Sequence, residues 1–94
     1  MGLIRGPVTH PAPTLSSIYS DSYQLLLDLL VAARKATPLT QAQVAERLGK
    51  PQSFVSKYER GERRLDVIEF IEVCRLLGVE PEKLIQRLEA QLFG

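Results

Sequence analysis

The sequence predicts an all-α fold, a compact domain of five helices, from three observations. Apolar residues recur at helical spacing from Tyr19 onward, and no stretch alternates apolar and polar residues as a strand would. Capping signals open two segments, at Thr40 with Gln43 three residues later and at Asp66 with Glu69. Glycines follow three of the segments, where helices commonly end: Gly49, Gly61 and Gly78.

The composition is that of a folded protein of one domain. The chain has 94 residues, of which 45% are hydrophobic and 24% charged, which excludes a disordered polyelectrolyte. The single cysteine, Cys74, cannot form an internal disulfide and fits a reducing compartment. The longest apolar run, residues 25–33, is interrupted by Asp28 and is too short to span a bilayer. We therefore expect a cytoplasmic protein without a membrane segment.

The N-terminal segment differs in composition from the rest. Residues 1–18 are rich in Pro, Gly, Ser and Thr and have no helical period, so we expect a flexible arm ahead of a folded domain at 19–94. His10 lies in this arm without Cys, His or carboxylate neighbours at ligand spacing. We expect neither a metal site nor another cofactor.

The first three helices have separable boundaries. The first is expected over about 21–36, with Ser20 as its N-cap and an end before Pro38, which disfavours helix at the preceding residue. The second is expected from Thr40 to the turn at Gly49, and the third over about 51–60. The joint between the second and third helices is short, so the two should move as a unit.

The last two helices carry apolar stripes. The fourth is expected from the cap at Asp66 to Gly78, with the stripe Val67, Phe70, Ile71, Cys74 and Leu77. The fifth opens at Pro81, because proline is favoured at the first helical position, and carries Leu84, Ile85, Leu88 and Leu92 on one side.

Positive charge is concentrated in one segment. Residues 47–64 hold six basic residues and two acidic ones, whereas the remainder holds six basic and nine acidic. On a helical projection of residues 51–60, the side chains that point inward are Pro51, Val55 and Tyr58, with Phe54 at the margin. Those that point outward are Ser53, Ser56, Lys57 and Arg60, with Gln52 on the flank. Hydroxyl, amide and basic groups on one face suit base edges and phosphates in a major groove.

The segment TQAQVAERLGKPQSFVSKYERG, residues 40–61, resembles the helix-turn-helix of the phage repressor and Cro family, also called the Xre type. In that family a small residue in the second helix, a turn glycine and a closing Glu-Arg-Gly or Glu-Asn-Gly recur together, here as Ala45, Gly49 and residues 59–61. The similarity extends over about residues 21–92. It implies a lambda-repressor-like DNA-binding domain.

The resemblance also implies roles by position. Gln41 corresponds to a glutamine that binds a DNA phosphate and braces the recognition helix. The base-reading positions correspond to Gln52, Ser53 and Lys57, beside which the projection adds Ser56. Backbone contacts are implied for Arg60, Arg63 and Arg64. Arg34 and Glu59 are implied to form a partly buried, structural ion pair between the first helix and the recognition helix.

Four residues need separate interpretation. Lys50 stands where an apolar residue is common, and its stem can cover the core while its ammonium reaches a DNA phosphate. Phe54 stands where a small polar residue is common, and two alternatives remain open: packing against the core or contact with a thymine methyl. We expect Tyr58 to be a core aromatic whose hydroxyl reaches the surface, and Cys74 to be a small core residue rather than a redox switch.

The sequence thus predicts sequence-specific binding of double-stranded DNA by a homodimer on a palindromic operator, as a transcriptional regulator and a repressor rather than an activator. The candidate dimer surface is the fifth helix with Val73 and Leu76, unless these residues only complete the monomer core. The alternative function is a protein-interaction module, an adaptor or antitoxin-like partner, that uses the fourth and fifth helices. The chain shows no Gly-rich phosphate loop and no cysteine or histidine cluster, so we do not expect an enzyme.

Overall fold

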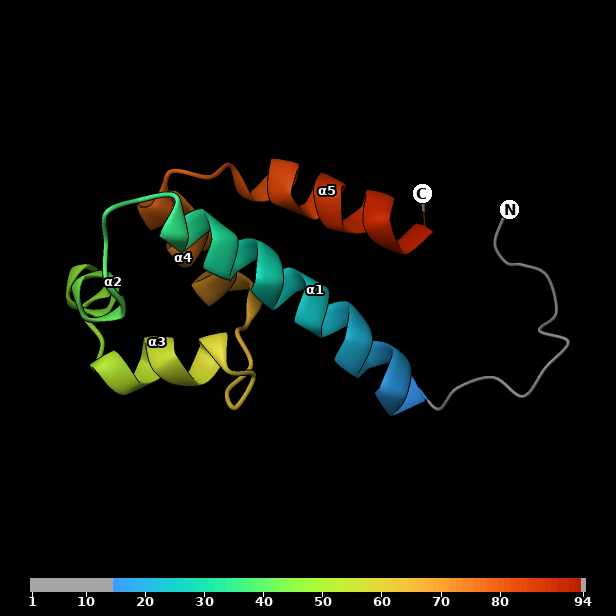
Figure 1. Ribbon diagram of the computed structural model, residues 1–94, viewed down its shortest axis with the longest axis horizontal. Coiled ribbons are helices and arrows are strands. Elements are labelled where there is room, and N and C mark those ends of the chain that lie inside the picture. Colours follow the sequence, from blue (N-terminus) through green and yellow to red (C-terminus); the bar gives the residue numbers. More distant parts are fainter. Residues whose placement is uncertain (1–14, 94) are drawn as a thin grey trace, which may run out of the picture.

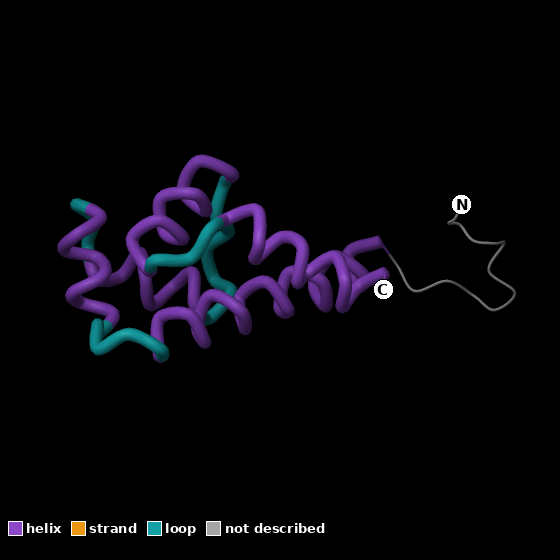
Figure 2. The backbone as a smooth tube through the Cα atoms, turned by 90° about the horizontal axis from the view of Figure 1, so that it is seen from above, coloured by secondary structure: helices purple, strands orange, loops and turns teal. Residues whose placement is uncertain are grey.

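Helices make up all the regular structure in residues 15–93, the part of the chain that the computed structural model describes. They are α1 (Leu15–Lys35), α2 (Gln41–Leu48), α3 (Gln52–Glu59), α4 (Val67–Leu77) and α5 (Pro81–Phe93). The longest helix, α1, packs against α3, α4 and α5, and α5 runs alongside it (Figure 1). Short loops join the helices (Figure 2). The predicted all-α fold of five helices is confirmed for these residues.

The start of α1 differs from the prediction. The helix begins at Leu15 rather than near Asp21, so Ser20 lies inside it and is not its N-cap. No proline or glycine occurs between Pro13 and the end of the helix, and nothing in that stretch stops the helix from extending toward the N-terminus. Residues 15–18 therefore belong to α1, while the rest of the expected arm, with His10, lies outside the described residues.

Capping boxes begin α2 and α4, as predicted. The Thr40 hydroxyl accepts the N–H of Gln43 at 3.1 Å, and the Gln43 side-chain oxygen accepts the N–H of Thr40 at 2.9 Å. Asp66 and Glu69 exchange the same two bonds at 2.7 and 3.0 Å. Each box satisfies two backbone donors that a helix N-terminus leaves without partners.

The turn between α2 and α3 depends on a glycine. Gly49 has φ of +72°, the left-handed conformation that residues with a Cβ rarely adopt, and the predicted turn at this glycine is confirmed. Pro51 occupies the N-cap of α3 and is exposed, rather than contributing to the inward face. The two short helices pack closely through the fully buried Val44 and Ala45 of α2 and Val55 of α3.

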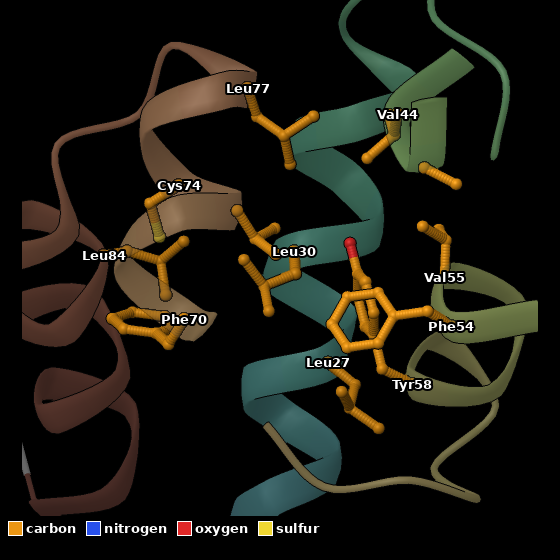
Figure 3. Close-up of a cluster of buried hydrophobic side chains, with 12 residues drawn as sticks. Leu27, Leu30, Val44, Phe54, Val55, Tyr58, Phe70, Cys74, Leu77 and Leu84 are labelled. Atoms are coloured by element: carbon orange, nitrogen blue, oxygen red, sulfur yellow. The ribbon is translucent and has the colours of Figure 1, made fainter. Parts of the chain in front are cut away.

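Leu27 and Leu30 of α1 lie at the centre of the hydrophobic core. Figure 3 shows Leu27 and Leu30 between the aromatic rings of α3 on one side and the apolar residues of α4 and α5 on the other. Both leucines are buried, and burying a leucine side chain contributes roughly 1.5–3 kcal/mol. The core thus fixes α3 against α1 from the inside.

The buried face of α4 is displaced from the predicted stripe, since Ile71 of that stripe is exposed and the buried residues are Phe70, Val73, Cys74 and Leu77. Val73, predicted as part of a dimer surface, is 1% exposed and belongs to the core, so that assignment is wrong. The reason is that α4 packs against both α1 and α5. Leu76 is half-buried against the core, whereas Val67 is 70% exposed although it lies in the predicted stripe.

The position of the Tyr58 hydroxyl differs from the prediction. Its side chain is completely buried, and its hydroxyl has no hydrogen-bond partner among the described residues, so it does not reach the surface as predicted. In Figure 3 the hydroxyl oxygen points into the apolar cluster. Burial, aided by the nearby Glu59 carboxylate, raises the pKa of this hydroxyl. Cys74 is also fully buried, and its burial raises the pKa of the thiol to about 11.

Candidate nucleic-acid interface

The outer face of α3 is open to solvent. Gln52, Ser53 and Lys57 are exposed, and Ser56 is half-buried. The Ser56 hydroxyl donates a hydrogen bond to the Ser53 carbonyl at 3.3 Å, which leaves its lone pairs free to accept from a ligand. The helix therefore presents amide, hydroxyl and ammonium groups outward, from a base fixed by the buried Val55 and Tyr58.

Phe54 packs into the core from the same helix. It is 7% exposed and meets Tyr58 edge to face, with ring centroids 5.6 Å apart and an interplanar angle of 67°. Of the two alternatives open for Phe54, the structure shows core packing. The outer part of the ring carries two cations, because Lys50 Nζ lies 5.1 Å and the Arg63 guanidinium carbon 4.7 Å from its centroid.

A hollow of about 370 Å³ lies beside these cations. The residues that line it are Gly49, Lys50, Pro51, Ser53, Phe54, Lys57 and Arg63. The structure thus brings together one predicted base-reading hydroxyl and three predicted DNA-contacting cations, from the turn, from α3 and from the loop after it. Such a concave, positively charged surface suits a phosphate group.

The other two predicted backbone-contacting arginines lie apart from this hollow. Arg60 is paired with Glu62 at 3.0 Å, both side chains being more than half exposed, and this pair raises the pKa of Arg60 and lowers that of Glu62. The Arg64 guanidinium carbon lies 4.4 Å from the centroid of Tyr23 on α1. The surface is therefore less positive than a count of basic residues suggests.

Arg63 is held by several hydrogen bonds. Its two terminal nitrogens donate to the two carboxylate oxygens of Glu69 at 2.9 and 2.8 Å, and one of them also donates to the Arg64 carbonyl at 2.8 Å. These hydrogen bonds, with the one from the Asp66 N–H, lower the pKa of Glu69 to about 2. The guanidinium is thereby fixed beside the hollow before any ligand binds.

Glu59 joins the motif to the first helix. Arg34 donates to both of its oxygens, at 2.7 and 3.2 Å, and to the Leu39 carbonyl at 3.2 Å. Gln41 of α2 donates to the same carboxylate at 2.8 Å. The Arg34 and Glu59 side chains are only 14% and 6% exposed, and the hydrogen bond with Glu59 raises the pKa of Arg34. One carboxylate thus holds α1, α2 and α3 together, and Gln41 braces the recognition helix.

Sequence reasoning missed two residues that shape the interface. From the sequence, Glu69 was assigned to helix capping alone. Its short separation from Arg63, six residues along the chain, was the available signal that the two side chains could form an ion pair. Tyr23 received no role, yet its hydroxyl accepts the Leu65 N–H at 2.9 Å and its ring lies under Arg64. The hydrogen bond between Tyr23 and Leu65 joins residues 42 positions apart, so no local sequence pattern predicts it.

No group of three or more His, Cys, Asp or Glu side chains in residues 15–93 is arranged to hold a metal ion. None of the described helices has the length and apolar character needed to cross a membrane.

Comparisons with known proteins agree with this architecture. The family model for the helix-turn-helix matches residues 30–84. A protein of Sinorhizobium fredii, named an uncharacterised HTH-type transcriptional regulator, is 36% identical over 61 residues, which cover 65% of this chain and 79% of that protein. A solved structure, an Xre-family-like protein from Pseudomonas syringae pv. tomato, is 55% identical with a TM-score of 0.78, covering 81% of this chain and 93% of that one.

The match to the family model includes the exposed face of α3 and the hollow beside it. It also includes Arg34, Gln41 and Glu59, which join α3 to α1 and α2. The similarity to the solved structure extends over most of both chains. The chain therefore belongs to the Xre-type helix-turn-helix family of DNA-binding proteins.

Proposed function

We propose that the protein is a sequence-specific transcriptional regulator that inserts α3 into the major groove of double-stranded DNA. The observation that carries this proposal is the exposed face of α3, whose polar groups stand on a helix held from behind by Tyr58 and by the Glu59 carboxylate. A rigid helix with outward amide, hydroxyl and ammonium groups can read base edges at a small entropic cost. The family consists of DNA-binding regulators and is not a family of enzymes.

The side chains divide between two tasks in this proposal. The groups that read bases are Gln52, Ser53, Ser56 and Lys57. The groups that contact the DNA backbone are Gln41, Lys50, Arg60, Arg63 and Arg64. For Arg60, release from Glu62 precedes the phosphate contact, and the exposure of this pair makes that exchange inexpensive.

We further propose that the protein binds a palindromic operator as a homodimer and represses transcription by occupying it. A single small module makes few contacts, and a second copy one helical turn away doubles them. Because Val73 is buried, the proposed dimer surface is the exposed part of α5 around Ile85, which is 49% exposed, with the partly exposed Leu88 and Leu92 at its margin. In this proposal the bound dimer represses by blocking access to the operator, and the protein acts in the cytoplasm.

The test is selection of binding sites from random duplex DNA, followed by affinity measurements on the selected site and its single-base variants. Lys57→Ala should change the preferred base pair at one position per half-site, by ~1–3 kcal/mol of discrimination. Lys83→Ala removes the same charge from the exposed surface of α5 and should alter neither affinity nor preference. A wild-type protein that enriches no sequence, or a Lys57 variant with unchanged preference, contradicts the assignment.

One observation favours the second candidate, a protein-interaction module. Val67 and Ile68, neighbours on α4, are 70% and 65% exposed, and Phe93 of α5 is 83% exposed, and exposed apolar residues that adjoin one another can form a contact surface for a partner. A protein-interaction module would bind its partner through these residues with little dependence on salt and would enrich no DNA sequence. The same selection experiment therefore separates the two functions.

A further inference from the structure

Two cations lie over the ring of Phe54, and neither packing in the core nor contact with DNA bases accounts for them. The ring's edge-to-face contact with Tyr58 faces inward, while Lys50 and Arg63 both lie over the ring. These two cations come from the turn before α3 and the loop after it, and the ring lies close to both of them. They border the hollow that Ser53 and Lys57 complete.

We propose that Phe54 is a positioning residue for DNA binding, an aromatic platform that holds Lys50 and Arg63 side by side to receive one backbone phosphate in this hollow. The inference rests on the proposed function. The aromatic face attracts both cations and offsets part of their mutual repulsion, which would otherwise drive the flexible Lys50 side chain away. Glu69 fixes Arg63 from its other side.

The ligand follows from the chemistry of the hollow. Its cationic groups, together with the Ser53 hydroxyl, can donate hydrogen bonds to anionic oxygens, and its position beside the base-reading face of α3 matches that of a phosphate flanking the groove. Arg63 keeps an outward edge, since its side chain remains 42% exposed despite its bond to Glu69. A phosphate diester can therefore approach without breaking that ion pair.

The test replaces Phe54 with leucine, which keeps an apolar side chain in the core and removes the aromatic face. Phe54→Leu should weaken binding to the selected operator and to unrelated duplex by the same factor, about 5- to 30-fold, as expected for two exposed cation–π contacts. The salt dependence should become shallower by about 0.9 in log–log slope, for one lost phosphate contact. Phe70→Leu is the matched control, a phenylalanine buried to the same extent in another part of the core, and should change neither quantity.

Two further measurements distinguish a platform from simple packing. In a Lys50→Met background, Phe54→Leu should cause a smaller loss of affinity, because one of its cations is already gone. In the free wild-type protein, ring currents should shift the Lys50 and Arg63 side-chain protons upfield in the NMR spectrum, and this shift does not require DNA. It remains measurable even if Phe54→Leu fails to fold.

The outcomes separate this proposal from the proposed function. If the wild type enriches an operator but folded Phe54→Leu binds with unchanged affinity and salt slope, the platform is refuted and the function stands. A changed preference at a single base pair would instead indicate a thymine contact, and absent ring-current shifts would show that the cations do not lie over the ring. Failure of the wild type to bind any duplex DNA overturns both.

Discussion

Two tyrosines near the core differ in what surrounds their hydroxyl groups. The hydroxyl of Tyr23 accepts the backbone N–H of Leu65, whereas the hydroxyl of Tyr58 is buried without a partner among the described residues. A buried polar group without a hydrogen bond costs roughly 1–3 kcal/mol. One oxygen atom therefore stabilises the loop before α4, and the other destabilises the centre of the molecule.

Removal of each hydroxyl should accordingly have opposite effects. Tyr58→Phe should raise the free energy of unfolding by up to about 1 kcal/mol, because it relieves an uncompensated desolvation and keeps the ring contacts with Phe54. Tyr23→Phe should lower it by about 1 kcal/mol through loss of the bond to the Leu65 N–H. Urea denaturation of the three proteins measures both changes, and a destabilised Tyr58→Phe would mean that the hydroxyl does have a partner.

At the scale of elements, charged side chains add to the apolar core in fixing how the segments around α3 meet. The carboxylate of Glu59 receives Arg34 from α1 and Gln41 from α2, and the carboxylate of Glu69 receives Arg63 from the loop after α3. The first of these is largely buried and the second is half open to solvent. They should therefore respond differently to mutation and to pH.

The buried pair should dominate stability. Arg34→Met leaves Glu59 with only the Gln41 amide and should cost ~2–4 kcal/mol, between the values for exposed and fully buried pairs. The double variant Arg34→Met with Glu59→Gln should recover part of this loss, since no buried charge then lacks a partner. Arg34→Lys should lie between wild type and Arg34→Met, because an ammonium cannot form the forked contact. Urea denaturation measures these changes. If Arg34→Met lowered the free energy of unfolding by less than about 0.5 kcal/mol, the pair would contribute no more than an exposed ion pair does.

The contribution of the Glu69 carboxylate to stability should be measurable as a loss of stability in acid. Its pKa is about 2 in the folded protein against an ordinary value of 4.5, so its stabilising contribution is complete above pH 4.5 and is lost as the pH falls from there to 2. Glu69→Gln retains a side-chain acceptor for the Asp66 N–H and should lose less stability than wild type over that interval. Glu72→Gln, at an exposed position on the same helix, is the control, and thermal unfolding at a series of pH values measures all three. Parallel acid profiles for wild type and Glu69→Gln would argue against the ion pair.

The helix boundaries show what sequence can predict at this scale. The starts of α2 and α4 and the turn at Gly49 were predicted, because capping boxes and left-handed glycines are local signals written in a few adjacent residues. The start of α1 was wrong by six residues, because no such local signal marks Leu15. Boundaries without a cap depend on propagation of the helix, which sequence patterns describe poorly.

At the scale of the whole molecule, burial depends on which helices pack together. The exposed polar face of α3 could be predicted, because a helical projection gives the face once the helix is known. The burial of Val73 and of the Tyr58 hydroxyl could not, because both depend on the position of α1 between its neighbours. The ion pair between Arg63 and Glu69 could not be predicted either, because it depends on the path of the loop in three dimensions.

The proposed dimer is tested at the scale of the whole molecule as well. Ile85→Glu places a charge at the centre of the proposed dimer surface and should shift sedimentation toward the monomer and weaken operator binding. Gln86→Glu adds the same charge at the neighbouring exposed position of α5 and should leave both unchanged if the surface is confined to the side of Ile85. Wild-type protein that sediments as a monomer and binds DNA as one copy would contradict the dimer.

The shared carboxylate of Glu59 also limits how the motif can be reused. A peptide of residues 40–61 would contain Gln41 and Glu59 but not Arg34, and so would carry an uncompensated anion behind its recognition helix. Grafting the motif onto another scaffold therefore requires the host to supply a cation from a crossing helix, and recombination between relatives should preserve α1 together with α3. The smallest exchangeable unit of this protein begins upstream of its helix-turn-helix.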